Sequence, residues 1–521
     1  MKKRILLMLA AVLMMLLSSC IPTANIAPSG PPVFKLEELP DIGEYSGKPS
    51  VRFHEKASDE FVPDENYGTL VPFIGRIKEF DGNSFGADIS MSYSKMGLCT
   101  TDGQIVVEPF DGYITYNDYY EAFPYYELIP YSDEAAEMMM QPDSVMLPVD
   151  GSWKMSLPSG AWLCGAGEGI ISVLVSDPET YEFRGLECFD YDGNKLFDVP
   201  KVWSAQGFSQ GYAPVNIGQD ERNACYIDKN GNVVSDFYTI CSAFNENGVA
   251  YVQEYNGCAY LINTSFERIS EIYDNIFFYD EKYITARSNY GHCDIISGDG
   301  KVIASVESSG FVNLYGNDEN LIYSYYNGFE DVYCNLDGTL FVNEEGYIPN
   351  TFVQERGYFS YKDSVYNIQT LFDSTGKILA RFEDCNSIIS VLEEENLVIY
   401  TKGNYDFEEF ENGRPIYSNP IRTAIYDLDE QKDLLVLDGQ GGVYPAGKDD
   451  RYLLISIYSD YDFGGSTRYC LFDTKTHKLV FSDCLMIDYY DIENGYFVVG
   501  NDSFCTLYDS ELKPVLRLIN E

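Results

Sequence analysis

The 521-residue sequence has little of what most enzymes and nucleic-acid-binding proteins need. It contains only three histidines, His54, His292 and His477, and no two of them stand at the spacing of metal ligands. This scarcity argues against a zinc site and against a histidine-based acid–base centre. It also has 35 Lys and Arg against 82 Asp and Glu, a formal net charge of −47. Because nucleic acids and anionic lipid headgroups are bound by cationic surfaces, we expect no nucleic-acid partner.

The N-terminal apolar run is too short to be a membrane-spanning helix. It covers 13 residues, 5–17, whereas a bilayer span needs about 20. Lys2, Lys3 and Arg4 precede the run and Leu17-Ser18-Ser19-Cys20 closes it, a pattern typical of a secretory signal peptide. The closing residues resemble the lipobox of bacterial lipoproteins. The resemblance implies a signal peptide over 1–19 and a lipid on Cys20 that anchors the chain to the outer face of the cytoplasmic membrane.

The segment after Cys20 is predicted to be a tether. Residues 21–32 include four prolines and show no apolar periodicity, which indicates a semi-extended linker. We therefore assign 20–60 to the lipidated cysteine and a flexible tether, and 61–521 to the folded domain. Its composition, 45% apolar and 15% aromatic for the whole chain, is sufficient for a core despite the acidity.

Short β-runs joined by Asp/Asn/Gly turns recur along this domain. The clearest copy is 225–234, Cys-Tyr-Ile-Asp-Lys-Asn-Gly-Asn-Val-Val, which has the composition of a β-hairpin. The turn positions are 36, 35, 36, 38 and 36 residues apart, at Asp192, Asp228, Asn263, Asp299, Asp337 and Asp373. A period this constant predicts a repeat protein.

A second landmark lies upstream of the hairpins. Segments 208–215 and 244–252 each contain a Phe, then a Gly, then an alternating strand. The two landmarks together resemble the WG-repeat family of bacterial proteins, in which an F-x-E-G-x-A-x-V stretch precedes an I-D-x-x-G-x-x-V segment. The resemblance is good over 208–303 and partial over 97–400. It implies a surface or interaction module and supplies no catalytic residue.

Each repeat offers three or four short strands that must stack on neighbouring repeats to bury their faces. We therefore predict an all-β, propeller-like fold, either one propeller of about seven or eight enlarged blades or two smaller propellers. An open β-solenoid is the alternative.

Thirteen cysteines are present, and twelve remain if Cys20 carries a lipid. Several occupy the same place in the repeat, three or four residues before an Asp of the turn, as Cys99, Cys225, Cys334 and Cys470 show. Equivalent positions face the same way, so we predict buried free thiols. One or two disulfides are the alternative in an exported protein.

Two motifs are better explained as turns than as chemical sites. Gly207 to Gly211 matches G-x-S-x-G, but a β-segment follows it and the sister repeat has Asn245 in place of Ser209; a nucleophile elbow requires a helix there. Segments 190–194 and 228–232 resemble fragments of calcium loops without the closing Glu. Because Asp, Asn and Gly are the residues of tight turns, we expect no cofactor and no metal site, with calcium as the alternative.

Tyrosines are concentrated in two acidic stretches, around 113–131 and 458–463. Exposed tyrosine rings beside carboxylates favour contact with sugars or proteins, whereas buried ones serve the strands. The candidate ligand-contact residues are Tyr116, Tyr119, Tyr120, Tyr125, Tyr126, Tyr458 and Tyr461.

These observations predict a lipid-anchored, extracytoplasmic β-repeat protein that binds or scaffolds envelope proteins or cell-wall glycans without catalysis. The alternative is a glycan-processing enzyme of the envelope that uses two carboxylates in a propeller channel. The sequence identifies neither the ligand nor a catalytic residue.

Overall fold

The computed structural model describes most of the predicted folded domain. The described part runs over 68–519 except for 77–94, 118–122, 131–142, 158–159, 177–182, 219–222, 280–281, 289–290, 308–311, 317–319, 328–329, 354–356, 364–367, 404–406, 412–413, 418–420, 440, 448–449, 459–466, 485, 493–494 and 501–503. The predicted signal peptide, Cys20 and the tether lie outside it. No helix within the described residues has the length and apolar character needed to cross a membrane.

The described residues form two compact units, 68–70 with 112–341, and 71–111 with 342–519. The 13-residue strand β3 (Ile105–Asn117) pairs with β2 through its first half and with β4 through its second. We number the sheets as blades in chain order. Blade 1 contains β1 (Leu70–Arg76), β2 (Lys95–Thr100) and the first half of β3.

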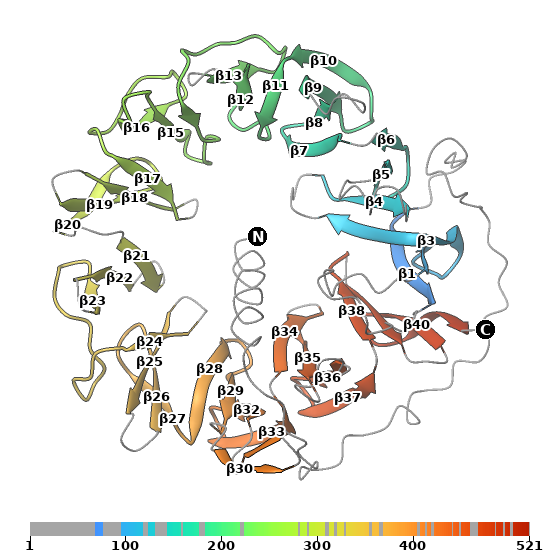
Figure 1. Cartoon of the computed structure of the whole chain (residues 1–521), viewed down its shortest axis with the longest axis vertical. Coiled ribbons are helices and arrows are strands. Elements are labelled where there is room, and N and C mark those ends of the chain that lie inside the picture. Colours follow the sequence, from blue (N-terminus) through green and yellow to red (C-terminus); the bar gives the residue numbers. More distant parts are fainter. Residues whose placement is uncertain are drawn as a thin grey trace. The chain divides into compact units, whose positions relative to one another are not determined.

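The first unit contains blades 2 to 7 (Figure 1). Blade 2 contains the second half of β3, β4 (Tyr125–Pro130), β5 (Ser144–Pro148) and β6 (Met155–Leu157); blade 3, β7 (Trp162–Gly167), β8 (Ile170–Ser176), β9 (Phe183–Asp190) and β10 (Lys195–Pro200); blade 4, β11 (Val202–Ala205), β12 (Tyr212–Ile217) and β13 (Ala224–Asp228); blade 5, β14 (Ile240–Cys241), β15 (Val249–Gln253) and β16 (Ala259–Asn263); blade 6, β17 (Asn275–Phe278), β18 (Tyr283–Arg287), β19 (His292–Ser297) and β20 (Val302–Glu307); blade 7, β21 (Val312–Gly316), β22 (Leu321–Tyr326) and β23 (Asp331–Asn335).

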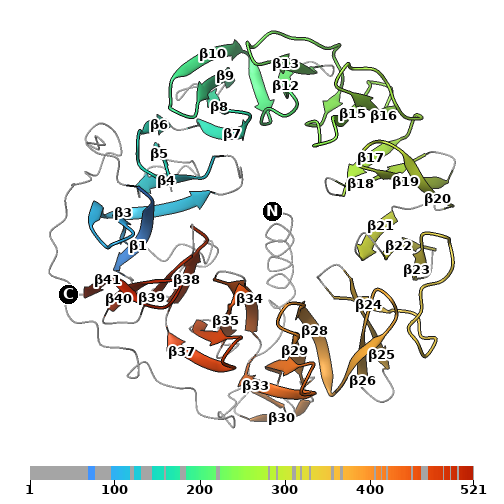
Figure 2. The same cartoon turned by 180° about the vertical axis from the view of Figure 1, so that it is seen from behind.

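The second unit contains blade 1 and blades 8 to 11, which Figure 2 shows from behind. Blade 8 contains β24 (Thr351–Phe352), β25 (Tyr358–Asp363), β26 (Ile368–Asp373) and β27 (Ile378–Glu383); blade 9, β28 (Cys385–Leu392), β29 (Leu397–Lys402), β32 (Arg422–Asp427) and β33 (Lys432–Asp438), with the hairpin β30 (Phe407–Glu411) and β31 (Arg414–Tyr417) inserted; blade 10, β34 (Gly441–Ala446), β35 (Tyr452–Tyr458), β36 (Thr467–Asp473) and β37 (Lys478–Cys484); blade 11, β38 (Met486–Tyr490), β39 (Tyr496–Gly500), β40 (Phe504–Asp509) and β41 (Pro514–Ile519).

The predicted hairpin turns are present, and their acidic residues bond to their own backbone. In blade 4, Asp228 Oδ1 accepts hydrogen bonds from the backbone N–H groups of Asn230 and Asn232, both at 2.9 Å. Gly231 has φ +79°, a left-handed conformation that disfavours other residues. The same bonding recurs at Asp190, Asn263, Asp373 and Asp509. Many carboxylates of this acidic chain are therefore structural parts of turns.

The second landmark also has a structural role. Phe208 and Phe244 are buried, and Ser209 and Tyr212 exchange backbone hydrogen bonds of 2.9 and 3.1 Å around Gly211. Strand β12 follows directly. The G-x-S-x-G motif is therefore a repeat turn, as predicted from the sister repeat, and not a nucleophile elbow.

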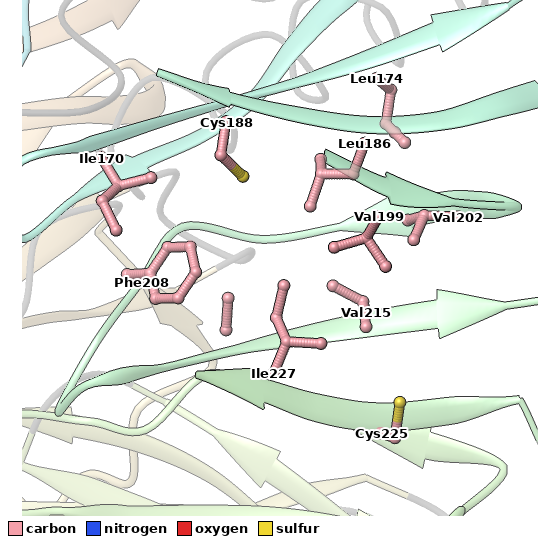
Figure 3. Close-up of a cluster of buried hydrophobic side chains, with 11 residues drawn as sticks. Ile170, Leu174, Leu186, Cys188, Val199, Val202, Phe208, Val215, Cys225 and Ile227 are labelled. Carbon is pink, nitrogen blue, oxygen red and sulfur yellow. The ribbon is translucent and has the colours of Figure 1, made fainter. Parts of the chain in front are cut away.

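The core lies between successive blades. One cluster joins Ile170, Leu186 and Cys188 of blade 3 to Val215 and Ile227 of blade 4 (Figure 3). Equivalent clusters join blades 2 and 3, 4 and 5, 5 and 6, and 6 and 7 in the first unit, and blades 8 to 11 in the second. Thus a sheet inside either unit, such as that of blade 4 or blade 9, buries both faces by stacking on its two neighbours.

These consecutive antiparallel sheets, packed face to face within each unit, are the blades of an all-β propeller fold. The strands pair antiparallel within each blade, unlike the parallel coil-to-coil pairing of a β-solenoid. The predicted count of about seven or eight blades is wrong, since the described residues form eleven. One 36-residue repeat is enough for a blade here. Blades 4, 5 and 7 have only three strands, and the segment after the third strand pairs with it through isolated bridges such as Ile227 to Val233 instead of forming a full fourth strand.

The prediction of buried free thiols is confirmed. The twelve described cysteines are free, and only Cys164 and Cys258 are not fully buried. Burial raises the pKa of the Cys188 thiol to about 12 and that of Cys225 to about 11. These thiols are therefore protonated at neutral pH and act as small apolar side chains.

Candidate functional site

Four of the seven tyrosines predicted as ligand contacts cannot be assessed. Tyr119, Tyr120 and Tyr461 lie outside the described residues, and Tyr458 ends strand β35 with its side chain outside the description. The possible role of these four in binding stays a prediction.

Burial contradicts a ligand-contact role for two others. The Tyr126 side chain is fully buried, and its hydroxyl donates a hydrogen bond to the Leu70 carbonyl. Tyr125 is buried in the cluster between blades 2 and 3, with its ring stacked on Phe123. Tyr116 is half-buried, and its ring centroid lies 5.7 Å from that of Tyr126. Tyr125 and Tyr126 are consecutive on β4 and point to opposite faces of the sheet, yet both are buried. The prediction failed for these two because the sheet is covered on both faces at this place.

A different set of apolar side chains is exposed on the first strands of four consecutive blades. These residues, the first-strand stripe, are 37 to 44% exposed and come from blades 3, 4, 5 and 6: Trp162, Trp203, Ile240 and Phe277. Two of the three tryptophans of the chain are among them. Large apolar residues that recur in this way on the surface are typical of interaction sites.

The four side chains face the following blade. Leu163, Cys241 and Ile276, the strand neighbours of Trp162, Ile240 and Phe277, belong to the clusters shared with the preceding blade. Because successive side chains of a strand point to opposite faces, the exposed residues point the other way. Each therefore lies at the junction between its own first strand and the next blade.

Trp203 reaches this face through a β-bulge. Val202 pairs with Ile217 and Ser204 with Asn216, so β11 has one extra residue at Trp203. Val202 and Ala205 both contact the cluster shared with blade 3. In a bulge, two residues of one strand lie opposite one residue of its partner. Trp203 and Ser204 both lie opposite Asn216 in this way, so both are placed on the face toward blade 5.

A cavity of about 170 Å³ lies at this junction of blades 4 and 5. Residues from the first two strands of blade 4 and from the start of blade 5 line it: Ser204, Ala205, Gln206, Pro214, Asn216, Thr239, Ile240 and Cys241. Gln206 also holds the two blades together, since its Oε1 accepts a 3.1 Å hydrogen bond from the Ala243 N–H. The cavity is larger than one water molecule requires.

One polar group of this cavity is not satisfied. The Thr239 Oγ1 atom is buried and has no hydrogen-bond partner among the described residues. Thr239 has the same strand parity as Cys241, which faces blade 4, so its side chain is on the cavity side. A buried hydroxyl without a partner costs roughly 1–3 kcal/mol, and a ligand or water that bonds to it would recover that energy.

The lining of the cavity is neutral. Four of its side chains are uncharged hydrogen-bonding groups, and its one titratable group is Cys241, whose thiol has its pKa raised by burial. No lining side chain could act as a general acid or base at neutral pH. The site is therefore suited to binding an uncharged group that has polar atoms and an apolar face.

No group of three or more His, Cys, Asp or Glu in the described part of the chain is arranged to hold a metal ion. In the two predicted calcium-loop fragments, the carboxylates of Asp190 and Asp228 bond to the side chains of Asn194 and Asn232 as well as to turn amides. These bonds explain the Asp and Asn content of both segments as turn chemistry.

Comparisons with known proteins bear on the fold alone. No protein-family model matches the chain, and no curated protein matches it. Similar solved structures include a eukaryotic initiation factor (12% identity, TM-score 0.38, 71% of this chain and 94% of that one). They also include BamB from Moraxella catarrhalis (13%, 0.28, 50% and 85%) and the Dos1 propeller (12%, 0.25, 52% and 78%). Likenesses this distant carry no argument about ligands.

The sequence contained a signal for the stripe that the tyrosine-based reasoning missed. Trp203, Ile240 and Phe277 are 37 residues apart, the repeat period within one residue. They stand upstream of both landmarks, in segments with too little alternation to predict a strand. The cavity had no such signal, since it depends on a bulge and on the contact of two blades.

Proposed function

We propose that this protein is a lipid-anchored, extracytoplasmic binding or scaffold module that contacts envelope proteins or cell-wall glycans and carries out no catalysis. The propeller fold favours a binding or scaffold role, and the first-strand stripe is the observation that supports it most directly. Four consecutive blades each present one exposed apolar residue on the first strand, and a neutral cavity lies at the junction of blades 4 and 5. A surface of this kind fits an extended partner better than a small substrate.

The proposed location depends on the lipobox and on Cys20. Lipidation of one cysteine would place the acidic folded domain outside the cytoplasmic membrane, separated from it by the tether. In cells given a labelled fatty acid, the full chain should acquire label and fractionate with membranes. A Cys20→Ala variant should lose the label and either retain its signal peptide or appear in the medium. Label on the Cys20→Ala variant would contradict the anchor.

The binding role is tested on intact cells and with the purified full chain in detergent. Crosslinking at the cell surface should capture a reproducible envelope partner, or the purified chain should bind a cell-wall fraction in sedimentation. Replacing the two exposed tryptophans of the stripe with alanine should reduce that capture. Capture that is unchanged by these substitutions would remove the stripe from the function, and turnover of an envelope glycan by the pure protein would favour the enzyme alternative.

A further inference from the structure

We propose that the cavity between blades 4 and 5 is a subsite for one sugar residue of a neutral glycan chain, with Trp203 as the platform for the sugar ring. The inference rests on the proposed binding function and names the ligand class of its site. It depends on four features of the same junction: the cavity volume, the uncharged lining, the unsatisfied Thr239 hydroxyl and the exposed indole of Trp203.

The polar lining matches the hydroxyl groups of a sugar. Ser204 and Thr239 provide hydroxyls, and Gln206 and Asn216 provide amides, so the site offers both donors and acceptors on two opposing blades. A sugar hydroxyl is itself a donor and an acceptor, which allows it to bond the Thr239 oxygen whichever role that oxygen takes. The existing bond of Gln206 to Ala243 positions its amide at the edge of the site.

The apolar part of the site supplies the second half of sugar recognition. The C–H faces of a pyranose ring are apolar, and a flat aromatic ring covers them with little loss of conformational entropy. The bulge in β11 places Trp203 on the same face as Ser204, which lines the cavity. Trp203 is 38% exposed, so its indole surface is accessible to a ligand before binding.

Charge selects against the other common polymers of an envelope. The chain has a net charge of −47, and no lysine or arginine lines the cavity. An anionic glycan or a phosphate-containing polymer would lose solvation and gain no ion pair in the site. A neutral chain avoids this cost. An extended peptide also presents neutral amides, but it does not need the flat platform of an indole.

The size of the site indicates a part of a longer ligand. A volume of about 170 Å³ is below the roughly 300–1,000 Å³ of pockets that enclose a whole small molecule. Trp162 presents apolar surface on blade 3, and Ile240, one of the residues that line the cavity, is exposed on blade 5. A glycan chain lying across the first strands would contact these residues with its flanking units.

The test measures binding of neutral oligosaccharides to the full chain in detergent by titration calorimetry and by tryptophan fluorescence. The probes are tetrasaccharides of glucose, mannose and N-acetylglucosamine, with tetragalacturonate as the anionic control. We expect at least one neutral probe to bind and the anionic one not to bind. Trp203→Ala should raise the Kd at least tenfold, and Thr239→Val, which keeps the side-chain shape, should raise it about fivefold.

Two controls separate binding from folding. Phe237 is also exposed in blade 4 but is not on the first strand, so Phe237→Ala should leave the Kd unchanged. Thr239→Val should leave the melting temperature unchanged or raise it, because the hydroxyl it removes has no partner in the described structure. A Thr239→Val protein that melts at lower temperature would show that the hydroxyl serves the fold.

The possible outcomes distinguish this inference from the proposed function. A neutral glycan that binds all variants equally would overturn the subsite while the binding function stands. A chain that binds no glycan but is crosslinked through Trp203 to an envelope protein would overturn the sugar and retain the function. Binding of neither a glycan nor a protein would overturn both.

Discussion

The contact between blades 5 and 6 provides a sharp test of the stacking that holds this fold together. The Tyr273 hydroxyl donates a 2.7 Å hydrogen bond to Asp294 Oδ2, and the Ser305 hydroxyl donates a 2.5 Å bond to Asp294 Oδ1. Both Tyr273 and Asp294 are buried. Tyr273 is bridged to Ala259 of blade 5 by two 2.8 Å backbone bonds, and Asp294 is on β19 of blade 6. The pair therefore ties one blade to the next.

The expected cost of Tyr273→Phe follows from this geometry. The substitution keeps the buried ring and removes one oxygen, which leaves the buried Asp294 carboxylate with one fewer donor. Burial, and then the hydrogen bond to Asp294, raise the pKa of Tyr273, so the tyrosine keeps its proton and acts as a donor throughout the physiological range. A hydrogen bond to a charged group contributes about 1.5–3 kcal/mol. We expect a loss of that size in local stability.

Hydrogen exchange measured by mass spectrometry locates this loss. Because blades mainly contact their neighbours, the change should be confined to blades 5 and 6. A loss of about 1.5–3 kcal/mol speeds exchange about ten- to hundredfold when opening is at equilibrium. Amides of β16 to β20 should exchange faster by that factor, and those of blade 11 should be unchanged.

Tyr326→Phe is the matched control, since it removes the same atom from a side chain that is 55% exposed in the same unit. Its exchange should match that of the unmodified protein. Equal exchange in blades 5 and 6 of the Tyr273→Phe protein would refute the assigned role of this hydrogen bond. An acceleration spread evenly over all eleven blades would refute the nearest-neighbour account of stability.

Three further predictions concern turns, thiols and pH. Gly231→Ala should destabilise the protein more than Gly257→Ala in urea denaturation, by about 1 kcal/mol or more. Both glycines have φ near +80°, so an alanine is strained to a similar degree at either position. Only at Gly231 would the added methyl group also lie 2.8 Å from an aromatic ring of β10, and equal destabilisation by the two substitutions would contradict this contact. A thiol reagent should modify Cys258 first in the native protein. Ten of the other described cysteines are buried, and burial raises the pKa of the half-buried Cys164 to about 12, which keeps its thiol protonated. Rapid modification of several thiols would contradict this packing. The hydrogen bond from Lys301 holds the pKa of Asp299 down to about 2, below the value near 4 of an unfolded aspartate. The contribution of Asp299 to stability is therefore present above about pH 4 and is lost as the pH falls toward 2. The melting temperatures of the unmodified and Asp299→Asn proteins should converge over that range, and a constant difference would contradict the assignment.

Much of the fold could be predicted from the sequence because its turns are local. Asp228 bonds to amides two and four residues away, so a ten-residue window contains all the chemistry of that hairpin. The buried thiols were equally accessible, since Cys225 and Cys470 stand at a fixed distance from such turns. The blade count was not accessible in this way. Whether a 36-residue repeat makes a whole blade depends on the irregular edge segment, which no local pattern specifies.

The candidate site was harder to predict for a related reason. Tyr125 and Tyr126 were chosen for their composition, and only the pairing of β4 with its neighbours shows that both are buried. The cavity brings Ser204 together with Thr239, which is 35 residues further along the chain, and the proposed subsite also requires Trp203 on the same face as Ser204. A bulge of one residue in β11 decides that arrangement.

A repeat protein separates folding from recognition along its own period. Turn residues such as Asp228 and Asp373 recur because every blade needs the same hairpin, so their recurrence carries no information about a ligand. Recognition needs positions where the copies differ while the backbone stays the same. The first strands meet this condition, with Trp162, Trp203 and Ile240 in successive blades. Under the proposed function, the exposed residues that the common hairpin does not require are therefore the candidates for the binding surface, and Trp162 and Trp203 are the first of them to test.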